Sequence, residues 1–145
     1  TTMAMQSFLS RLASHGIRCA FVGGCMALST AQATPFLHCE VTYAGATQVV
    51  HAVPVADPYE VAPVDIAERF LFKVVMTATR GRLDHVLIYT YLQQEPRPVL
   101  LQQAKYFAPF KPRRQPVLLT GEQHMYGGPI ERELIYRCWL GGIQP

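Results

Sequence analysis

The feature that most constrains the fold is a series of short apolar runs, rich in β-branched and aromatic residues, that glycine and proline separate. Between residues 37 and 43, Leu37, Cys39 and Val41 alternate with polar residues, a pattern typical of a strand with one buried face. No long apolar stripe with the period of a helix follows residue 33. We therefore predict an all-β domain with strands over residues 37–43, 47–53, 69–79, 83–92, 99–106, 117–120, 123–126 and 131–140.

The number and spacing of these runs favour a small antiparallel β-sandwich, with an open barrel as the alternative. The sandwich would be immunoglobulin-like in architecture at most. The single tryptophan, Trp139, follows the second cysteine directly instead of lying between the two cysteines, as it does in immunoglobulin domains. The run 83–92 is apolar on both faces and is predicted at the centre of a sheet. The proline-rich segments 54–63 and 109–116 are predicted as loops, because proline cannot donate to a strand ladder.

The first 33 residues have the organisation of a signal peptide. Arg11 and Arg18 give a positive segment, and the uncharged run 19–28 follows it. Ala31 and Ala33 then supply the small-x-small pattern that signal peptidase requires. The sequence therefore predicts a helical signal segment over residues 1–33 with cleavage after Ala33.

Cleavage at this position would leave a single domain over residues 34–145. Two alternatives for the leading segment are a retained anchoring helix and a lipoprotein acylated on Cys25. The apolar run is shorter than the roughly 20 residues that cross a bilayer, so we expect no transmembrane helix in the mature chain. A periplasmic or secreted location follows from the signal-peptide interpretation.

Charge argues against a nucleic-acid partner. The whole chain has 13 Lys and Arg against ten acids, a net charge of +3. Because Arg11 and Arg18 would leave with the signal, the mature chain would carry only about +1. The basic footprint of a nucleic-acid-binding face is therefore not supported.

Cysteine usage agrees with export. The mature chain would keep Cys39 and Cys138, near its two ends, and such a pair is expected to oxidise outside the cytoplasm. Alternation places both side chains on apolar faces, so a bridge requires the first and last strands to be neighbours, with Cα atoms roughly 4.4 to 6.8 Å apart. Two buried free thiols are the alternative.

A candidate metal site comes from the first hairpin. If Ala44 and Gly45 form a two-residue turn, His38 lies directly opposite His51, with Glu40 on the same face. Two imidazoles and a carboxylate at that separation would suit a zinc or copper ion. A one-residue slip in register would move His51 to the other face and leave only exposed histidines.

A second candidate site is the basic loop before residue 117. Lys111, Arg113, Arg114 and Phe110 are predicted to form an interaction patch, since arginine and aromatic residues are favoured at interface centres. Tyrosines and phenylalanines of the neighbouring strands could contribute to it. The alternative is that the aromatic residues fill the core while the basic residues keep the loop in solution.

No catalytic motif accompanies these residues. The sequence has no Gly-x-Ser-x-Gly elbow, no His-Glu-x-x-His helix and no phosphate-binding glycine loop. We therefore expect a non-catalytic binding or envelope-assembly module that needs no cofactor and whose partner is an envelope protein or a small ligand. The alternative function is a periplasmic metal-binding protein that uses the histidine pair for zinc or copper.

Overall fold

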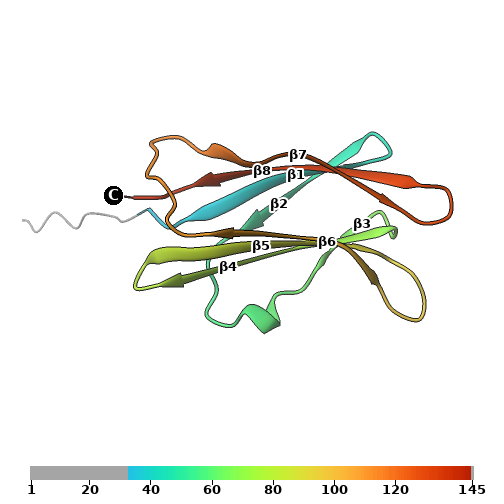
Figure 1. Ribbon diagram of the computed structural model, residues 1–145, viewed down its shortest axis with the longest axis horizontal. Helices are drawn as coiled ribbons and strands as arrows, with labels where there is room; N and C mark the ends of the chain where they lie inside the picture. The colour runs from blue at the N-terminus through green and yellow to red at the C-terminus, as the bar shows by residue number, and fades with distance from the viewer. Residues whose placement is uncertain (1–32, 145) are drawn as a thin grey trace, which may run out of the picture. The chain divides into compact units, whose positions relative to one another are not determined.

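The computed structural model describes residues 33–144, so the predicted signal segment lies outside the described residues except for Ala33. The described chain is all-β and forms two antiparallel four-stranded sheets that pack face to face (Figure 1). We call the sheet with the order β2-β1-β8-β7 sheet 1 and the sheet with the order β3-β4-β5-β6 sheet 2. No backbone ladder joins the two sheets, so the predicted sandwich is confirmed over the open barrel.

The observed strands follow the predicted ones closely, with two differences at the level of single elements. Predicted strands 117–120 and 123–126 are one strand, β7, whose ladder with β8 shifts register between Leu118 and Glu122. Gly121 has φ +66°, which lets the extra residues bulge without ending the strand. The short β3 was not predicted. The strands are β1 (Phe36–Tyr43), β2 (Ala46–Ala52), β3 (Val64–Ile66), β4 (Phe70–Thr79), β5 (Arg82–Leu92), β6 (Val99–Phe107), β7 (Val117–Gly127) and β8 (Arg132–Gly141).

Two tight turns connect the strands of the β1–β2 and β4–β5 hairpins. Ala44 and Gly45 both have positive φ, 49° and 80°, as the two central residues of a type I′ turn require. Arg80 and Gly81 repeat this geometry between β4 and β5. The first turn pairs His38 with His51, as predicted. The run 83–92 becomes β5, an inner strand of sheet 2, also as predicted.

The core lies between the sheets and consists of the inward-facing residues of both. Phe72 of sheet 2 packs against Tyr136 of sheet 1 with ring centres 5.1 Å apart. Tyr43 and Phe70 make a similar edge contact at 5.4 Å. One continuous apolar cluster results: Leu37, Cys39, Val41, Val50, Ile66, Phe70, Phe72, Val74, Met76, Leu83, Val86, Ile88, Leu92, Leu134, Tyr136, Cys138 and Leu140.

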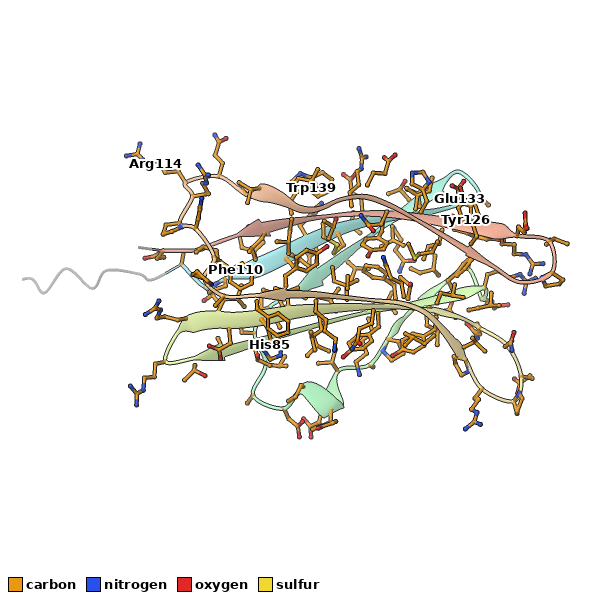
Figure 2. The ribbon with its side chains drawn as sticks, in the orientation of Figure 1. His85, Phe110, Arg114, Tyr126, Glu133 and Trp139 are labelled. Atoms are coloured by element: carbon orange, nitrogen blue, oxygen red, sulfur yellow. A yellow bond between two sulfur atoms is a disulfide. The ribbon has the colours of Figure 1, made fainter. Side chains whose placement is uncertain are left out.

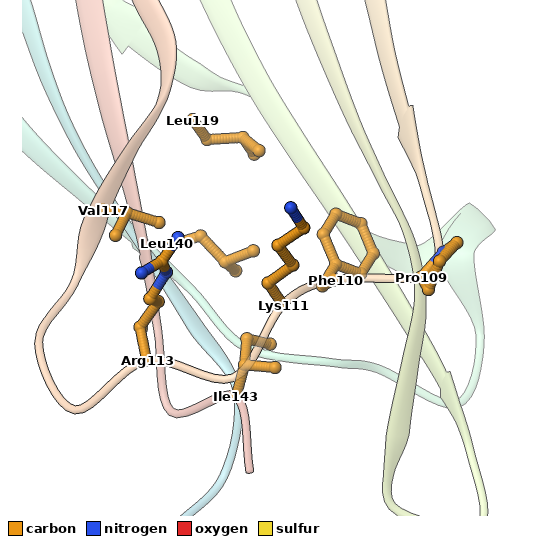
Figure 3. A pocket seen from close by; sticks show the side chains of 9 residues that line it. Pro109, Phe110, Lys111, Arg113, Val117, Leu119, Leu140 and Ile143 are labelled. Carbon is orange, nitrogen blue, oxygen red and sulfur yellow. The ribbon is translucent and has the colours of Figure 1, made fainter. Parts of the chain in front are cut away.

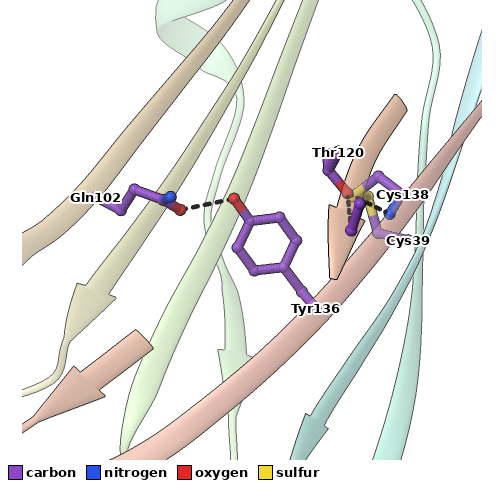
Figure 4. The surroundings of a disulfide bond; sticks show 6 residues. Cys39, Gln102, Thr120, Tyr136 and Cys138 are labelled. Atoms are coloured by element: carbon purple, nitrogen blue, oxygen red, sulfur yellow. Dashed lines mark hydrogen bonds between the residues drawn. A yellow bond between two sulfur atoms is a disulfide. The ribbon is translucent and has the colours of Figure 1, made fainter. Parts of the chain in front are cut away.

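Cys39 and Cys138 form a disulfide between neighbouring strands of sheet 1 (Figure 4). Both side chains are completely buried, as their strand parity predicted. Their Cα atoms are 4.1 Å apart, just under the predicted range, because the two residues pair directly in the β1–β8 ladder. The disulfide therefore ties the first strand to the last within one sheet instead of joining the two sheets.

The proline-rich segment after β2 covers part of the outer face of sheet 2. It contains the one-turn 3₁₀ helix η1 (Pro58–Glu60), which lies below β4 in Figure 1. The Val55 amide donates to the Met76 carbonyl at the free edge of β4. Val75 of β4, which faces away from the core, is only 3% exposed. Within residues 33–144, no helix has the length and apolar character to cross a bilayer.

Candidate functional site

The loop between β6 and β7 carries the predicted interaction patch. Phe110 is half-buried and packs against the core cluster, so it anchors the loop to the sandwich. Lys111, Arg113 and Arg114 are exposed. Three prolines in the loop restrict its backbone and prevent a strand ladder there. Phe110 thus attaches the loop to the sandwich, and the three cations are its exposed part. Figure 2 shows Arg114 pointing away from the sheets.

A cavity of about 250 Å³ lies beside this loop (Figure 3). Its apolar wall comes from one end of the β7–β8 pair, where the start of β7 meets the end of β8, through Val117, Leu119 and Leu140. Phe110, Lys111 and Arg113 contribute the loop side, while Arg114 does not line the cavity. The lining is completed by Pro109, Gly141 and Ile143.

No ion pair within the described residues compensates the positive charge at this cavity. Among the ion pairs formed by residues 33–144, none includes Lys111, Arg113 or Arg114. The loop from Pro109 to Pro116 contains no acidic residue. Such a cavity is suited to a ligand that carries both an apolar group and an anionic group. The apolar group would contact the apolar wall, and the anion would lie next to Lys111 and Arg113.

The predicted histidine pair is present on the outer face of sheet 1. His38 and His51 are direct partners in the β1–β2 ladder, and their ring centres are 4.9 Å apart. Trp139 of β8 lies on the other side of His38, at 5.9 Å between ring centres. His51 is exposed and His38 is half-buried, so the pair is open to solvent on one side.

The structure does not bring Glu40 to the histidines as a free carboxylate. Arg137 Nη2 donates to Glu40 Oε2 at 3.0 Å, and the same guanidinium lies 3.9 Å from Glu122. Across the described part of the chain, no three His, Cys, Asp or Glu side chains converge as a metal site would require. What remains of the predicted ligand set is therefore two imidazoles.

A second histidine cluster on the same face was not predicted. His124 Nδ1 lies 2.7 Å from Glu133 and its Nε2 lies 3.2 Å from Glu122, while the Tyr126 hydroxyl donates to Glu133. The hydrogen bond to Glu133 is the main reason that the pKa of His124 is raised, and His124 in turn lowers the pKa of Glu133. The alternation of residues along β7 could have placed His124 on the outer face. Its pairing with Glu133 could not be predicted in this way, because it depends on the turn that sets the register between β7 and β8.

A partly buried polar bridge links the two sheets at the side where β6 and β7 run. The Tyr136 hydroxyl of sheet 1 donates to Gln102 of sheet 2 at 2.6 Å (Figure 4). The Gln102 amide donates to Gln123 at 3.2 Å. Burial raises the pKa of Tyr136 strongly, with a smaller contribution from Tyr106. Thr120 accepts from the amide of Cys138 at 3.0 Å beside the disulfide. These contacts serve the fold, because they satisfy polar groups inside the sandwich.

Comparison of the chain with protein-family models, with curated proteins and with solved structures finds no match. The geometry described above is therefore the basis for a function.

Proposed function

We propose that this chain is a non-catalytic binding module that acts outside the cytoplasm, in a periplasm or as a secreted protein. Its contact site is the cavity beside the β6–β7 loop, together with Lys111 and Arg113. The observation that carries the proposal is the combination of an apolar hollow with cations that have no carboxylate partner in the described chain. Its partner is an acidic segment of an envelope protein, or a small anionic ligand, that also presents an apolar group.

The energetics favour this kind of partner. Burying one aliphatic or aromatic side chain in the cavity would contribute about 1.5 to 3 kcal/mol. The free cations at the surface would mainly raise the association rate and select an acidic partner over a basic one. Because Phe110 anchors the loop to the core, the site is largely formed before binding, which reduces the entropic cost of association.

Two observations support export. The Cys39–Cys138 disulfide belongs to the oxidising compartments in which such bonds persist. The first strand begins at Phe36, just beyond the predicted cleavage after Ala33, so cleavage there would leave every strand of the sandwich intact. An envelope-assembly role is compatible with the same site, since an assembly module also works by binding.

Binding of synthetic peptides tests the proposal. Fluorescein-labelled peptides in which Asp or Glu is next to Leu or Phe are titrated with the protein, and fluorescence anisotropy reports the complex. We expect saturable binding that weakens with added salt, because the rim cations are exposed. Peptides with Lys in place of the acidic residue should not bind.

Two matched variants locate the site. Lys111→Glu/Arg113→Glu should abolish binding of the acidic peptides. Arg97→Glu/Lys105→Glu makes the same change in net charge at exposed positions away from the cavity lining and should retain it. Absence of saturable binding by every acidic peptide, or equal loss in both variants, would show that the cavity is not the contact site.

A further inference from the structure

The histidine pair on the outer face of sheet 1 supports a second site that the proposed binding function does not use. We infer that His38 and His51 bind one Cu²⁺ ion, with water completing the coordination. The sequence suggested three protein ligands for zinc or copper, and the structure leaves two, because Glu40 is paired with Arg137. This reduced ligand set decides between the two metals.

The strand geometry holds the two rings at a chelating distance. The residues are direct neighbours in an antiparallel ladder, so their backbones cannot separate without breaking sheet 1. If each ring nitrogen binds the metal at about 2.0 Å, each ring centre lies about 3.2 Å from it, and two rings at right angles about the metal have centres about 4.5 Å apart. The observed 4.9 Å is close to this value. Rotation of the side chains alone would therefore bring both nitrogens to one ion.

The number of ligands favours copper over zinc. A structural zinc site is normally closed by four protein ligands in a tetrahedral arrangement, and His38 and His51 supply only two imidazoles. Cu²⁺ binds nitrogen donors more tightly than the other divalent metals of its row and accepts a tetragonal arrangement in which water fills the remaining positions. His51 is exposed, so water can reach the ion.

The surroundings provide a direct readout. Trp139 is the only tryptophan of the chain, and its ring centre is 5.9 Å from that of His38. A Cu²⁺ ion held by His38 would lie close enough to the indole to quench its fluorescence. His124 on the same face pairs with Ile135 in the ladder and not with Trp139. It therefore serves as the control, a histidine that is not next to the indole.

The experiment is a titration of the full chain with Cu²⁺ while Trp139 emission is recorded. It uses a Cys19→Ser/Cys25→Ser background, because free thiols bind copper. We expect quenching that saturates at one equivalent. His38→Ala and His51→Ala should each weaken copper binding by about 100-fold. A single imidazole lacks the second ligand that the strand pairing holds next to the ion at high effective concentration. His124→Ala should titrate like the parent, and excess Zn²⁺ should not displace the copper.

Electron paramagnetic resonance of the one-to-one complex gives an independent result. Hyperfine coupling to two imidazole nitrogens is expected in the parent and to one in His51→Ala. The variants should match the parent in thermal unfolding, because both side chains lie on the outer face of sheet 1. Parent-like quenching in both alanine variants, or no saturable quenching in the parent, would overturn the inference.

Discussion

Sheets 1 and 2 are stabilised in different ways. Sheet 1 carries the disulfide, and every ion pair among residues 33–144 lies on its outer face. Sheet 2 has none of these pairs, and the segment after β2 lies over part of its outer face, where Val75 is buried. We infer that sheet 2 mainly stabilises the fold. The outer face of sheet 1 presents polar side chains to solvent, the histidine pair among them.

The largest expected effect is loss of the disulfide from sheet 1. Cys39→Ser/Cys138→Ser should lower the free energy of unfolding by about 2 to 5 kcal/mol, the usual cost in a small exported domain. The sequence separation of 99 makes the closed loop long, which favours the upper part of this range in the chain-entropy model. Urea unfolding of the oxidised parent and the variant measures it. Equal midpoints would show that sheet 1 does not depend on the bond.

A valine on each outer face compares the sheets directly. Val75→Ala on sheet 2 should cost about 2 kcal/mol, because two buried methyl groups are lost and a cavity remains. Val49→Ala on sheet 1 removes the same atoms from a side chain that is 47% exposed and should cost much less. Thermal or urea unfolding compares the two. Similar losses would mean that the outer faces are not covered differently.

Two buried hydroxyls provide a smaller comparison. Tyr136→Phe removes the donor that reaches across to Gln102 and should cost about 1 kcal/mol. The Thr90 hydroxyl of sheet 2 is buried with no hydrogen-bond partner within the described chain, so Thr90→Val should be neutral or stabilising by up to about 1 kcal/mol. Urea midpoints of both variants are compared with the parent. A destabilised Thr90→Val would reveal a partner for that hydroxyl.

The smallest effect is a pH dependence from the outer face of sheet 1. The pKa of His124 in the folded protein is raised above its ordinary value of 6.5. Its contribution to the free energy of unfolding is therefore complete below pH 6.5 and is lost as the pH rises through the pKa of the folded protein. The pKa of Glu133 in the folded protein is lowered below its ordinary value of 4.5. Its contribution to the free energy of unfolding is therefore present above pH 4.5 and is lost as the pH falls through the pKa of the folded protein. The pair therefore stabilises most between about pH 4.5 and 6.5.

NMR titration of the His124 ring protons measures this contact. Glu133→Gln should shift the titration of His124 to lower pH, because the amide carries no charge and is a weaker partner. Glu131→Gln removes a nearby carboxylate that forms no ion pair with His124 and serves as the control. An unchanged titration in Glu133→Gln would contradict the assignment of the shift to Glu133.

The sequence predicted the features that depend on local periodicity. The two-residue turn at Ala44 and Gly45 and the period of two along each strand were enough to place His38 opposite His51. The same parity placed both cysteines in the core, and the requirement of a bond then made β1 and β8 neighbours.

Features that depend on strand order could not be predicted in this way. Glu40 and Arg137 are 97 residues apart, so their ion pair appears only once β1 and β8 are aligned. The cavity combines the β6–β7 loop with the ends of β7 and β8, and the bulge at Gly121 shifts which residues of β7 point inward. Each of these depends on tertiary packing, which a single strand does not encode.

An exported sandwich closed by one disulfide is the central proposal for this chain. Intact-mass spectrometry of protein recovered from outside the cytoplasm tests it most directly. The expected mass is that of residues 34–145 less two hydrogens, because cleavage follows Ala33 and Cys39 is bonded to Cys138. Treatment with a thiol reagent after denaturation should then add nothing. A mass that includes the first 33 residues, or two reactive thiols per chain, would contradict the account.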